Sequence, residues 1–357
     1  MINKLTLTDF RNHKISRIDT RGANNIIIIG ENGAGKTAIL EAVSMLSGDR
    51  GMRGSDMNEI ARFGGCGGFS AYADLDDETS VCIYYNSGDS NRHARLDGEN
   101  TALSNLEKYV SIVWLSPRED RLFVDTASDR RTFFDRLASN FDSSHSGRVS
   151  KFSKLLSERA FALKSGRDEK WLNVLDNELS ATAISISAMR IQYCGEINYF
   201  LENYAMSLTG KIEQLLIDGT TISDAERIYR QYLYDNRNLI NDKMVLDGPH
   251  KSDFGMFNKD LNLPVYLTST GQQKKALFTL IMSHAKLLHT KTKRDAIILL
   301  DEAAAHLDSA SREMFFSSLY SNGAQVWATG LDAASFAKTP NAVFVTCHNG
   351  EISNILY

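Results

Sequence analysis

Cysteine is scarce in this chain of 357 residues. The four cysteines, Cys66, Cys82, Cys194 and Cys347, lie far apart and form no C-x-x-C pair. Such spacing indicates neither a disulfide framework nor a zinc site. It is typical of a protein that works in a reducing compartment, so we expect a cytoplasmic location.

Long apolar runs and a strong net charge are also missing. No run approaches the ~20 apolar residues that a membrane-spanning helix needs. The N-terminal segment "MINKLTLTDFRNH" alternates polar and apolar residues, whereas a signal peptide would have an apolar core. We therefore expect a soluble protein with no membrane partner. The formal net charge of −4 argues against a uniformly basic surface, but a local cluster of Lys and Arg is enough for binding nucleic acid.

Proline occurs only four times, and none lies between Pro117 and Pro249. A proline-free run rich in Leu, Ala, Glu, Lys and Arg favours helices. Residues 149–164 and 171–208 have a helical pattern and are separated by the polar break "SGRDEK". We predict an arm of antiparallel, coiled-coil-like helices over residues 144–245. With about 35 residues per helix at ~1.5 Å each, the arm would be roughly 50 Å long. The alternative is a helical subdomain folded against the body. A solvated helix face explains the basic residues of this region better than a DNA-binding track does; they are Arg148, Lys151, Lys154, Arg159, Lys164, Arg167 and Lys170.

Short strands with alternating polar and apolar residues dominate the rest of the chain. They are "INKLTLTDF", "GFSAYADL", "SVCIYYN" and "HARLDG". This pattern predicts an antiparallel lobe with one solvated face, beside a parallel core.

The stretch "IIIIGENGAGKTAILEA", residues 26–42, carries the first chemical motif. An apolar strand runs into a glycine-rich turn and then a helix, with the phosphate-binding P-loop spacing Gly30-x-x-x-x-Gly35-Lys36-Thr37. Lys36 would reach the β and γ phosphates of ATP, and Thr37 would offer its hydroxyl to Mg²⁺. The residues expected to contact ATP in this loop are Gly30, Asn32, Gly33, Gly35, Lys36 and Thr37.

A second motif, "AIILLDEAAAHLD", occupies residues 296–308. An apolar run ending in two carboxylates predicts a buried strand whose C-terminal tip carries Asp301 and Glu302, where open α/β sheets bind ligands. Asp301 would hold Mg²⁺, directly or through water. Glu302 would be the catalytic carboxylate that polarises the attacking water, with Lys36 as the second catalytic residue. The second acid separates the chain from kinases, which must keep water out.

Between these motifs lies "TSTGQQKKALFTLIMSHAKLL", residues 268–288. Its Ser-x-Gly-Gln element resembles the signature motif of the ABC ATPase superfamily, with Ser269, Gly271 and Gln272 at the matching positions and Thr270 in place of the first glycine. A helix N-terminus with a hydroxyl suits a γ-phosphate, and the superfamily supplies it from the opposite subunit. The local alternative is an ordinary helix cap by Ser269 or Thr270. Asp308, at the end of "HLD", matches the superfamily's D-loop at the dimer seam.

Two departures weaken a transporter interpretation. Transporter ATPases carry a glutamine between P-loop and signature, which "WLSPREDRL" lacks, and Thr329 and Gly330 stand where their switch histidine would be. Thr329 is our candidate for the γ-phosphate sensor. Arg11 could contact nucleotide or cap the first strand. His250 could be a functional base or a hydrogen-bonded structural histidine.

Several longer segments carry a resemblance to a known family. They are "LTDFRNH", "GENGAGKT" with "LEAV", "LSPREDRLFVDTASDRRTFFDR", "GPHKSDF", "STGQQKK", "LLDEAAAHLD" and "QVWATGLD". Over nearly its full length the chain resembles the RecF family of recombination mediator ATPases, which is related to SMC-type heads. The resemblance implies a homodimer formed on ATP binding that recognises duplex DNA and single-strand/duplex junctions. It also implies RecR-type and RecO-type partners in loading recombinase.

We therefore expect an α/β fold, an ABC-type P-loop ATPase head with a mixed sheet core and an antiparallel β lobe. The head would comprise residues 1–143 and 246–357, with residues 144–245 inserted as the helical arm. Three functions compete: a DNA-repair clamp controlled by ATP, a transporter ATPase subunit, and an ATPase of another SMC-like complex, such as one that activates a nuclease. The long arm argues against the transporter, and no clustered His and Asp ligands in the sequence support a nuclease site.

Overall fold

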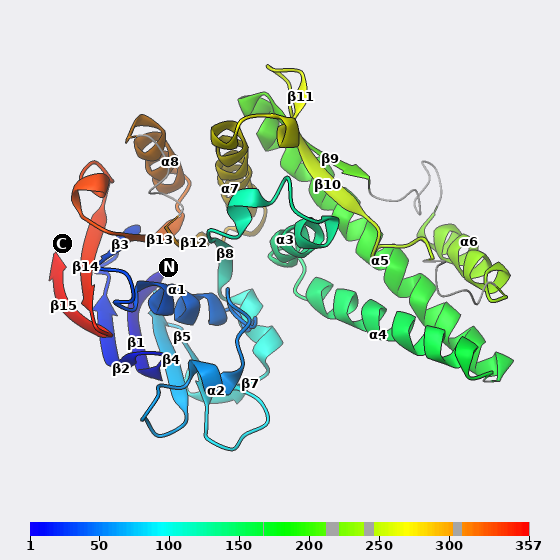
Figure 1. Ribbon diagram of the computed structural model, residues 1–357, viewed down its shortest axis with the longest axis horizontal. Coiled ribbons are helices and arrows are strands. Elements are labelled where there is room, and N and C mark those ends of the chain that lie inside the picture. Colours follow the sequence, from blue (N-terminus) through cyan, green and yellow to red (C-terminus); the bar gives the residue numbers. More distant parts are fainter. Residues whose placement is uncertain (167, 212–220, 239–245, 303–308, 357) are drawn as a thin grey trace. The chain divides into compact units, whose positions relative to one another are not determined.

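The computed structural model describes residues 1–166, 168–211, 221–238, 246–302 and 309–356. The chain forms two compact units (Figure 1). The first comprises Met1–Arg121 and Leu277–Tyr357, and the second Leu122–Ala276. Residues 122–143 and 246–276, which we assigned to the head, thus fall in the second unit together with residues of the predicted arm. The domain limits drawn from the sequence stay a prediction.

An antiparallel sheet forms one layer of the first unit. Its strands are β1 (Ile2–Phe10), β2 (His13–Asp19), β4 (Phe69–Leu75), β5 (Ser80–Tyr85), β6 (His93–Leu96) and β7 (Glu99–Thr101). Their order is β2-β1-β4-β5-β6-β7. Along β4, Phe69, Ala71 and Ala73 are buried while Tyr72 between them is exposed, the alternation of a sheet with one solvated face. The predicted antiparallel lobe is confirmed.

A mostly parallel sheet forms the other layer. Its strands are β3 (Asn25–Ile29), β8 (Ser111–Leu115), β12 (Ala296–Leu300), β13 (Gln325–Gly330), β14 (Ala342–His348) and β15 (Glu351–Leu356). The order is β15-β14-β3-β13-β12-β8, and only the edge strand β15 is antiparallel to its neighbour. All five residues of β12 are buried, as expected when both faces of a parallel sheet are covered. The C-terminal ends of β3, β12 and β13 meet at one edge.

Helix α1 (Lys36–Met45) packs against both sheets of the first unit. Its residues 38–45 are all buried, and they join the inner faces of both sheets in one apolar core. Helix α2 (Met57–Ile60) is short and lies in the connection to β4. Helices α7 (Thr270–Thr292) and α8 (Ser309–Ser321) contact each other through Phe278 and Phe315, whose rings are 4.5 Å apart in an edge-on arrangement.

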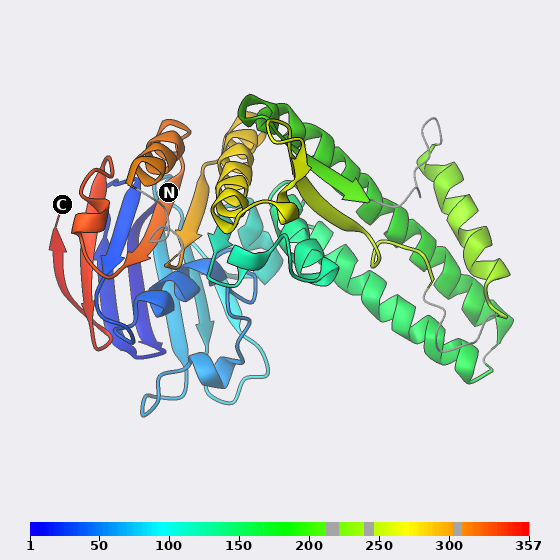
Figure 2. The same cartoon turned by 45° about the horizontal axis from the view of Figure 1, so that its top comes forward.

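The second unit is mainly helical. It contains α3 (Ala127–Ser139), α4 (His145–Lys164), α5 (Glu169–Leu201) and α6 (Ile222–Asp235), with a sheet of order β11-β10-β9. The strands are β9 (Met206–Lys211), β10 (Asp253–Asn258) and β11 (Leu263–Pro264). Helices α4 and α5 run side by side (Figure 2) and are joined at residues 165–168, inside the predicted break. No helix in the described ranges is both long and apolar enough to cross a membrane.

The prediction that the second long helix extends to residue 208 is wrong. Helix α5 ends at Leu201, and Ala205 adopts a left-handed backbone conformation with φ of 50°, which interrupts a right-handed helix. Strand β9 then begins and pairs with β10. On its other side, the Asn198 side-chain amide donates to the Leu208 carbonyl (3.0 Å) and accepts from the Leu208 N–H (2.6 Å).

A buried carboxylate joins three helices of the second unit. Asp176 of α5 is 1% exposed and accepts hydrogen bonds from Arg159 Nε of α4 (2.6 Å) and Arg237 Nη2, just after α6 (2.6 Å). Arg159 Nη2 also donates to the Leu233 carbonyl at 2.6 Å. The expectation that Arg159 lies on a solvated face is therefore wrong. A buried carboxylate can hold an arginine inside a helical unit, and the helical pattern alone does not show such a partner.

We predict that Asp176→Asn lowers the free energy of unfolding by about 3–5 kcal/mol, because it leaves two buried guanidinium groups without their counter-charge. Urea unfolding followed by circular dichroism measures this. The matched control is Glu178→Gln, which breaks a second ion pair between α4 and α5, Lys151–Glu178 at 2.7 Å, where both side chains are about half exposed. That variant should lose less than about 1 kcal/mol. Similar losses in the two variants would contradict the prediction.

Candidate functional site

The P-loop connects β3 to α1, and its glycines meet close neighbours. Gly30 has φ of 154°, and a Cβ there would lie 2.3 Å from the Cys347 carbonyl oxygen of β14. Gly35 has φ of 110°, and a Cβ there would lie 2.6 Å from His13 Nε2. Gly35 also caps α1 without any side-chain hydrogen bond. The first N–H groups of α1, which have no acceptor within the helix, are thus left to an anion.

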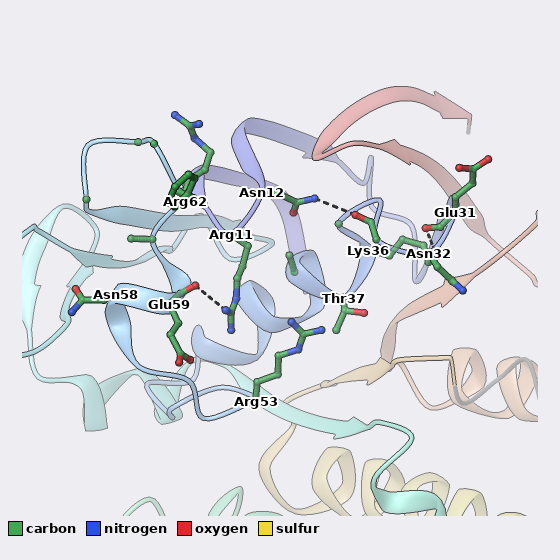
Figure 3. Close-up of a pocket in the computed structure, with 18 of the residues that line it drawn as sticks. Arg11, Asn12, Glu31, Asn32, Lys36, Thr37, Arg53, Asn58, Glu59 and Arg62 are labelled. Atoms are coloured by element: carbon green, nitrogen blue, oxygen red, sulfur yellow. Dashed lines mark hydrogen bonds between the residues drawn. The ribbon is translucent and has the colours of Figure 1, made fainter.

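Lys36 is buried, and its ammonium group is held by the loop itself. Nζ donates to the carbonyl oxygens of Gly30 (2.6 Å) and Glu31 (2.9 Å). Lys36 and Thr37 follow one another at the start of α1 and both line the same cavity (Figure 3). The loop therefore places one cation and one hydroxyl at the N-terminus of a buried helix.

The predicted magnesium residues are brought together from distant parts of the chain. Thr37 Oγ1 donates to Asp301 Oδ1 at 2.9 Å, across 264 positions of sequence. Thr329 Oγ1, at the end of β13, donates to the same carboxylate oxygen at 3.0 Å. Asp301 is 8% exposed. The ends of β12 and β13 and the start of α1 thus meet at one carboxylate.

Glu302 follows directly and adopts an unusual backbone conformation. Its φ is 55°, in the left-handed region, which costs a non-glycine residue on the order of 1–3 kcal/mol and often marks a functional turn. Its N–H donates to Thr329 Oγ1 at 2.8 Å, and its exposed side chain lines the P-loop cavity. The turn therefore buries the Asp301 carboxylate while exposing that of Glu302 to the cavity, which Thr37 also lines.

The cavity around the P-loop has a volume of about 1240 Å³. One part of its wall comes from the loop and α1. A further part comes from the segment between α1 and β4, which contributes Arg53, Asn58 and Arg62 (Figure 3). Phe63 of the same segment also lines the cavity. These four residues belong to no sequence motif, so no motif predicts them. The density of arginine and glycine over residues 50–68 is the signal that could have pointed to them.

Arg11 ties this second wall to the P-loop helix. Its guanidinium donates to both carboxylate oxygens of Glu41 in α1, at 2.8 and 2.7 Å, and Nη1 donates to the Glu59 carbonyl at 2.8 Å. Glu41 is fully buried. These hydrogen bonds do not cap the first strand, and contact with nucleotide stays a prediction, because Arg11 lines the cavity. Arg11 also positions the cavity wall.

His13 supports the P-loop from β2. It is fully buried, with Nδ1 2.8 Å from Ser16 Oγ and Nε2 3.0 Å from the Gly35 carbonyl oxygen. Burial lowers the pKa of His13, which favours the neutral imidazole. Because a carbonyl only accepts, we assign the proton to Nε2, and Nδ1 accepts from Ser16. His13, which the sequence shows only as part of the segment "LTDFRNH", thus holds the P-loop turn at Gly35 in place.

The signature residues lie in the second unit, at the start of α7. Ser269 Oγ accepts from the Gln272 N–H (3.4 Å), and Gln272 Oε1 accepts from the Ser269 N–H (3.3 Å), which is a reciprocal capping box. Ser269, Gly271 and Gln272 are all exposed. Ser269 therefore caps the helix, as the local alternative expected, and stays accessible. Asp308 lies outside the described residues.

Two candidates from the sequence remain, His250 and the magnesium site. His250 stacks on Phe152 within the second unit, with ring centroids 5.7 Å apart. In the described part of the chain, no group of three or more His, Cys, Asp or Glu side chains is arranged to hold a metal ion. Any Mg²⁺ site on these residues would rest on Thr37 and Asp301.

Comparison with known proteins agrees with this architecture. The profile of the RecF/RecN/SMC N-terminal domain matches residues 1–354. Curated relatives called DNA replication and repair protein RecF include those of Mesorhizobium japonicum, 33% identical over 98% of this chain and 97% of the relative, and Agrobacterium fabrum, 34% identical over 99% and 98%. The chain is thus similar to these proteins along its whole length.

Solved structures show the same fold. A structure of the recombination mediator protein RecF with ATP, in the RecFOR pathway, superposes with a TM-score of 0.82 at 21% identity and covers all of this chain and 99% of that one. A Pyrococcus furiosus Smc head domain superposes with a TM-score of 0.53 at 14% identity, over 99% and 95%. The expected ABC-type head with a helical insertion is confirmed. By its full-length match to the domain profile and to these relatives, the chain belongs to the RecF family and is an ABC-type ATPase.

Proposed function

We propose that this chain is an ATP-dependent, DNA-binding recombination mediator. ATP binding produces a homodimer that recognises duplex DNA next to single-strand gaps. Together with RecR-type and RecO-type proteins, the dimer helps to load recombinase in DNA repair and replication restart. Support comes from family membership, from relatives called DNA replication and repair proteins, and from the RecFOR pathway to which the solved RecF belongs.

The observation that carries the ATPase part is the Asp301 carboxylate held by the hydroxyls of Thr37 and Thr329. ATP would lie in the 1240 Å³ cavity, with its phosphates at Gly30, Asn32, Gly33 and Gly35. Lys36 would exchange its carbonyl acceptors for phosphate oxygens, a stronger charge-assisted pair. The glycine backbone and the helix N-terminus fit an anion of this kind.

The donor set also fits Mg²⁺, which prefers hard oxygen ligands. The Thr37 hydroxyl and the Asp301 carboxylate would hold the ion, directly or through water. When bound, it would neutralise charge on the phosphate oxygens. Thr329 would keep the Asp301 carboxylate in place and, near the end of the phosphate chain, would act as the γ-phosphate sensor.

Glu302 would orient and polarise the attacking water. Its side chain is exposed to the cavity that holds Lys36 and Thr37, and its backbone is anchored to Thr329. The other half of each composite ATP site would come from the partner subunit, through Ser269, Gly271 and Gln272. Asp308 would lie at the dimer seam. Hydrolysis would then control how long the dimer persists on DNA.

Lys36→Met should abolish dimerisation with ATP, because it removes the charge that offsets the β and γ phosphates. Light scattering with and without ATP and Mg²⁺ measures it. Lys4→Met, which removes an equal charge from an exposed position on β1, should dimerise as the wild type does. A Lys36→Met protein that still dimerises on ATP addition would rule out this role for the lysine.

Glu302→Gln should bind ATP and dimerise but hydrolyse at least ~100-fold more slowly, since positioning and general-base help contribute on that order. Steady-state phosphate release and nucleotide binding should be measured on the same preparation. Glu351→Gln, which neutralises an exposed acid on β15, serves as the control and should hydrolyse normally. Hydrolysis by Glu302→Gln within a few-fold of wild type would remove Glu302 from the mechanism.

Ser269→Arg should bind ATP but remain monomeric, because a bulky cation at the seam blocks closure and leaves the P-loop of the same chain intact. Thr290→Arg, an exposed position near the other end of α7, introduces the same cation and should dimerise. In a mixture of the two variants, the Ser269→Arg subunit supplies an intact P-loop and the Lys36→Met subunit supplies an intact signature. One of the two composite sites is then complete, so some ATP-dependent association should return. Analytical ultracentrifugation showing normal dimers of Ser269→Arg alone would place the signature away from the seam.

A further inference from the structure

A second cavity lies in the first unit, at the edge of the antiparallel sheet. Its volume is about 280 Å³, slightly below the ~300–1,000 Å³ of typical small-molecule sites. Its wall comes from β5, from the β6–β7 hairpin and from the chain that follows the hairpin. The lining residues are Tyr84, Arg92, His93, Ala94, Asn100, Thr101, Ala102 and Leu103. None of them lines the P-loop cavity.

Arg92 brings a partly buried cation to this cavity. Nη2 donates to the Gly48 carbonyl at 2.7 Å, whereas Nη1 is buried and has no hydrogen-bond partner in the described chain. Burial lowers the pKa of Arg92, and the nearby charge of Asp49 partly opposes this effect. A buried guanidinium N–H without an acceptor is costly, and guanidinium groups pair well with phosphate. Arg92 lines the cavity, and a small movement of its side chain would bring this N–H to an anion there.

A stack of planar side chains stands beside Arg92. Tyr84 of β5 lies opposite His93 of β6, and their rings stack with centroids 5.3 Å apart. The Arg95 guanidinium lies over the Tyr84 ring at 4.9 Å, and Arg95 Nε and the Tyr84 hydroxyl both donate to Asn100 Oδ1. The His93 side chain is 46% exposed. The stack therefore ends in an accessible ring that can take another planar group.

Carboxylates around the cavity already have partners. Asp89 accepts from His93 Nε2 (2.9 Å) and from the Asn86 amide (3.0 Å), while Asp97 accepts from the Ser80 N–H (2.7 Å). These contacts orient the imidazole and fix the hairpin. Arg92 and the neutral amide of Asn100 both line the cavity.

We propose that this cavity binds one unpaired nucleotide of single-stranded DNA, with the phosphate on Arg92 and the base on the exposed face of His93. The inference rests on the proposed DNA-binding function and deepens it, because it names the part of the chain that detects a gap. Base stacking on aromatic side chains together with a phosphate contact is how proteins bind single strands without reading sequence. The small cavity has room for one unpaired unit and would exclude a paired base.

The test compares a gapped duplex with an uninterrupted duplex of equal length, by fluorescence anisotropy with ATP and Mg²⁺. Wild type should prefer the gapped DNA. Arg92→Gln should weaken binding to the gapped DNA about tenfold and leave the uninterrupted duplex unchanged, since one stacked and phosphate-bound nucleotide contributes about 1–3 kcal/mol. His93→Ala, at an exposed position, should do the same and carries the test if Arg92→Gln does not fold.

The matched control is Arg17→Gln, which removes an equal charge from an exposed position on β2 of the same sheet. It should change both affinities by less than about twofold, because one distant surface charge acts only through screened electrostatics. Inorganic phosphate at matched ionic strength can bind Arg92 but cannot stack on His93, so it should weaken the preference for gapped DNA only in part. If it abolishes the preference for gapped DNA, the cavity is a simple anion site and the inference is overturned.

The remaining outcomes separate the two proposals. Wild type that prefers gapped DNA, with both variants keeping that preference, overturns the nucleotide site alone. Wild type that binds neither DNA overturns the proposed function, and the nucleotide site with it.

Discussion

The hydrogen bonds that converge on Asp301 are the constraint on which the candidate site depends. One buried carboxylate oxygen accepts from Thr37 at the start of α1 and from Thr329 at the end of β13. A charged group with so little exposure needs such donors. Because the three residues belong to different elements, the carboxylate fixes the P-loop relative to two strand ends. The left-handed turn at Glu302 follows from the same arrangement, since its N–H is bound to Thr329.

Further buried polar groups hold the P-loop helix between the two sheets. Glu41 lies inside the apolar core of the first unit and is neutralised by the two-point contact of Arg11. His13 reaches the loop from the antiparallel sheet and bonds the Gly35 carbonyl. Each contact fixes the antiparallel sheet to the P-loop or to α1 at one defined place. Apolar packing alone would allow these elements to shift relative to one another. The site is therefore positioned by a few directional bonds set within a large apolar core.

Much of this could be predicted from sequence because its signals are local. A strand, a glycine turn and a helix follow one another at the P-loop, and an apolar run ends in two acids at Asp301. Other features depend on partners far along the chain. Arg159 has the pattern of a surface residue, yet Asp176 and Leu233 draw it inside. Phe63 and Arg62 line the cavity through the path of an irregular segment, which no periodicity describes. The sequence pattern predicts a helix where β9 lies. The segment is a strand because it pairs with β10, which is distant in sequence, and a local pattern does not show such a partner.

The amide of Asn198 has a wider consequence for the second unit. A strand at the edge of a sheet carries unpaired N–H and C=O groups. These groups can pair with a strand of another molecule, and repeated pairing leads to aggregation. On β9 the peptide of Leu208 is occupied on that side by a side chain from α5. These two hydrogen bonds leave the N–H and C=O of Leu208 unavailable to a strand of another molecule, so one route to unwanted self-association is closed.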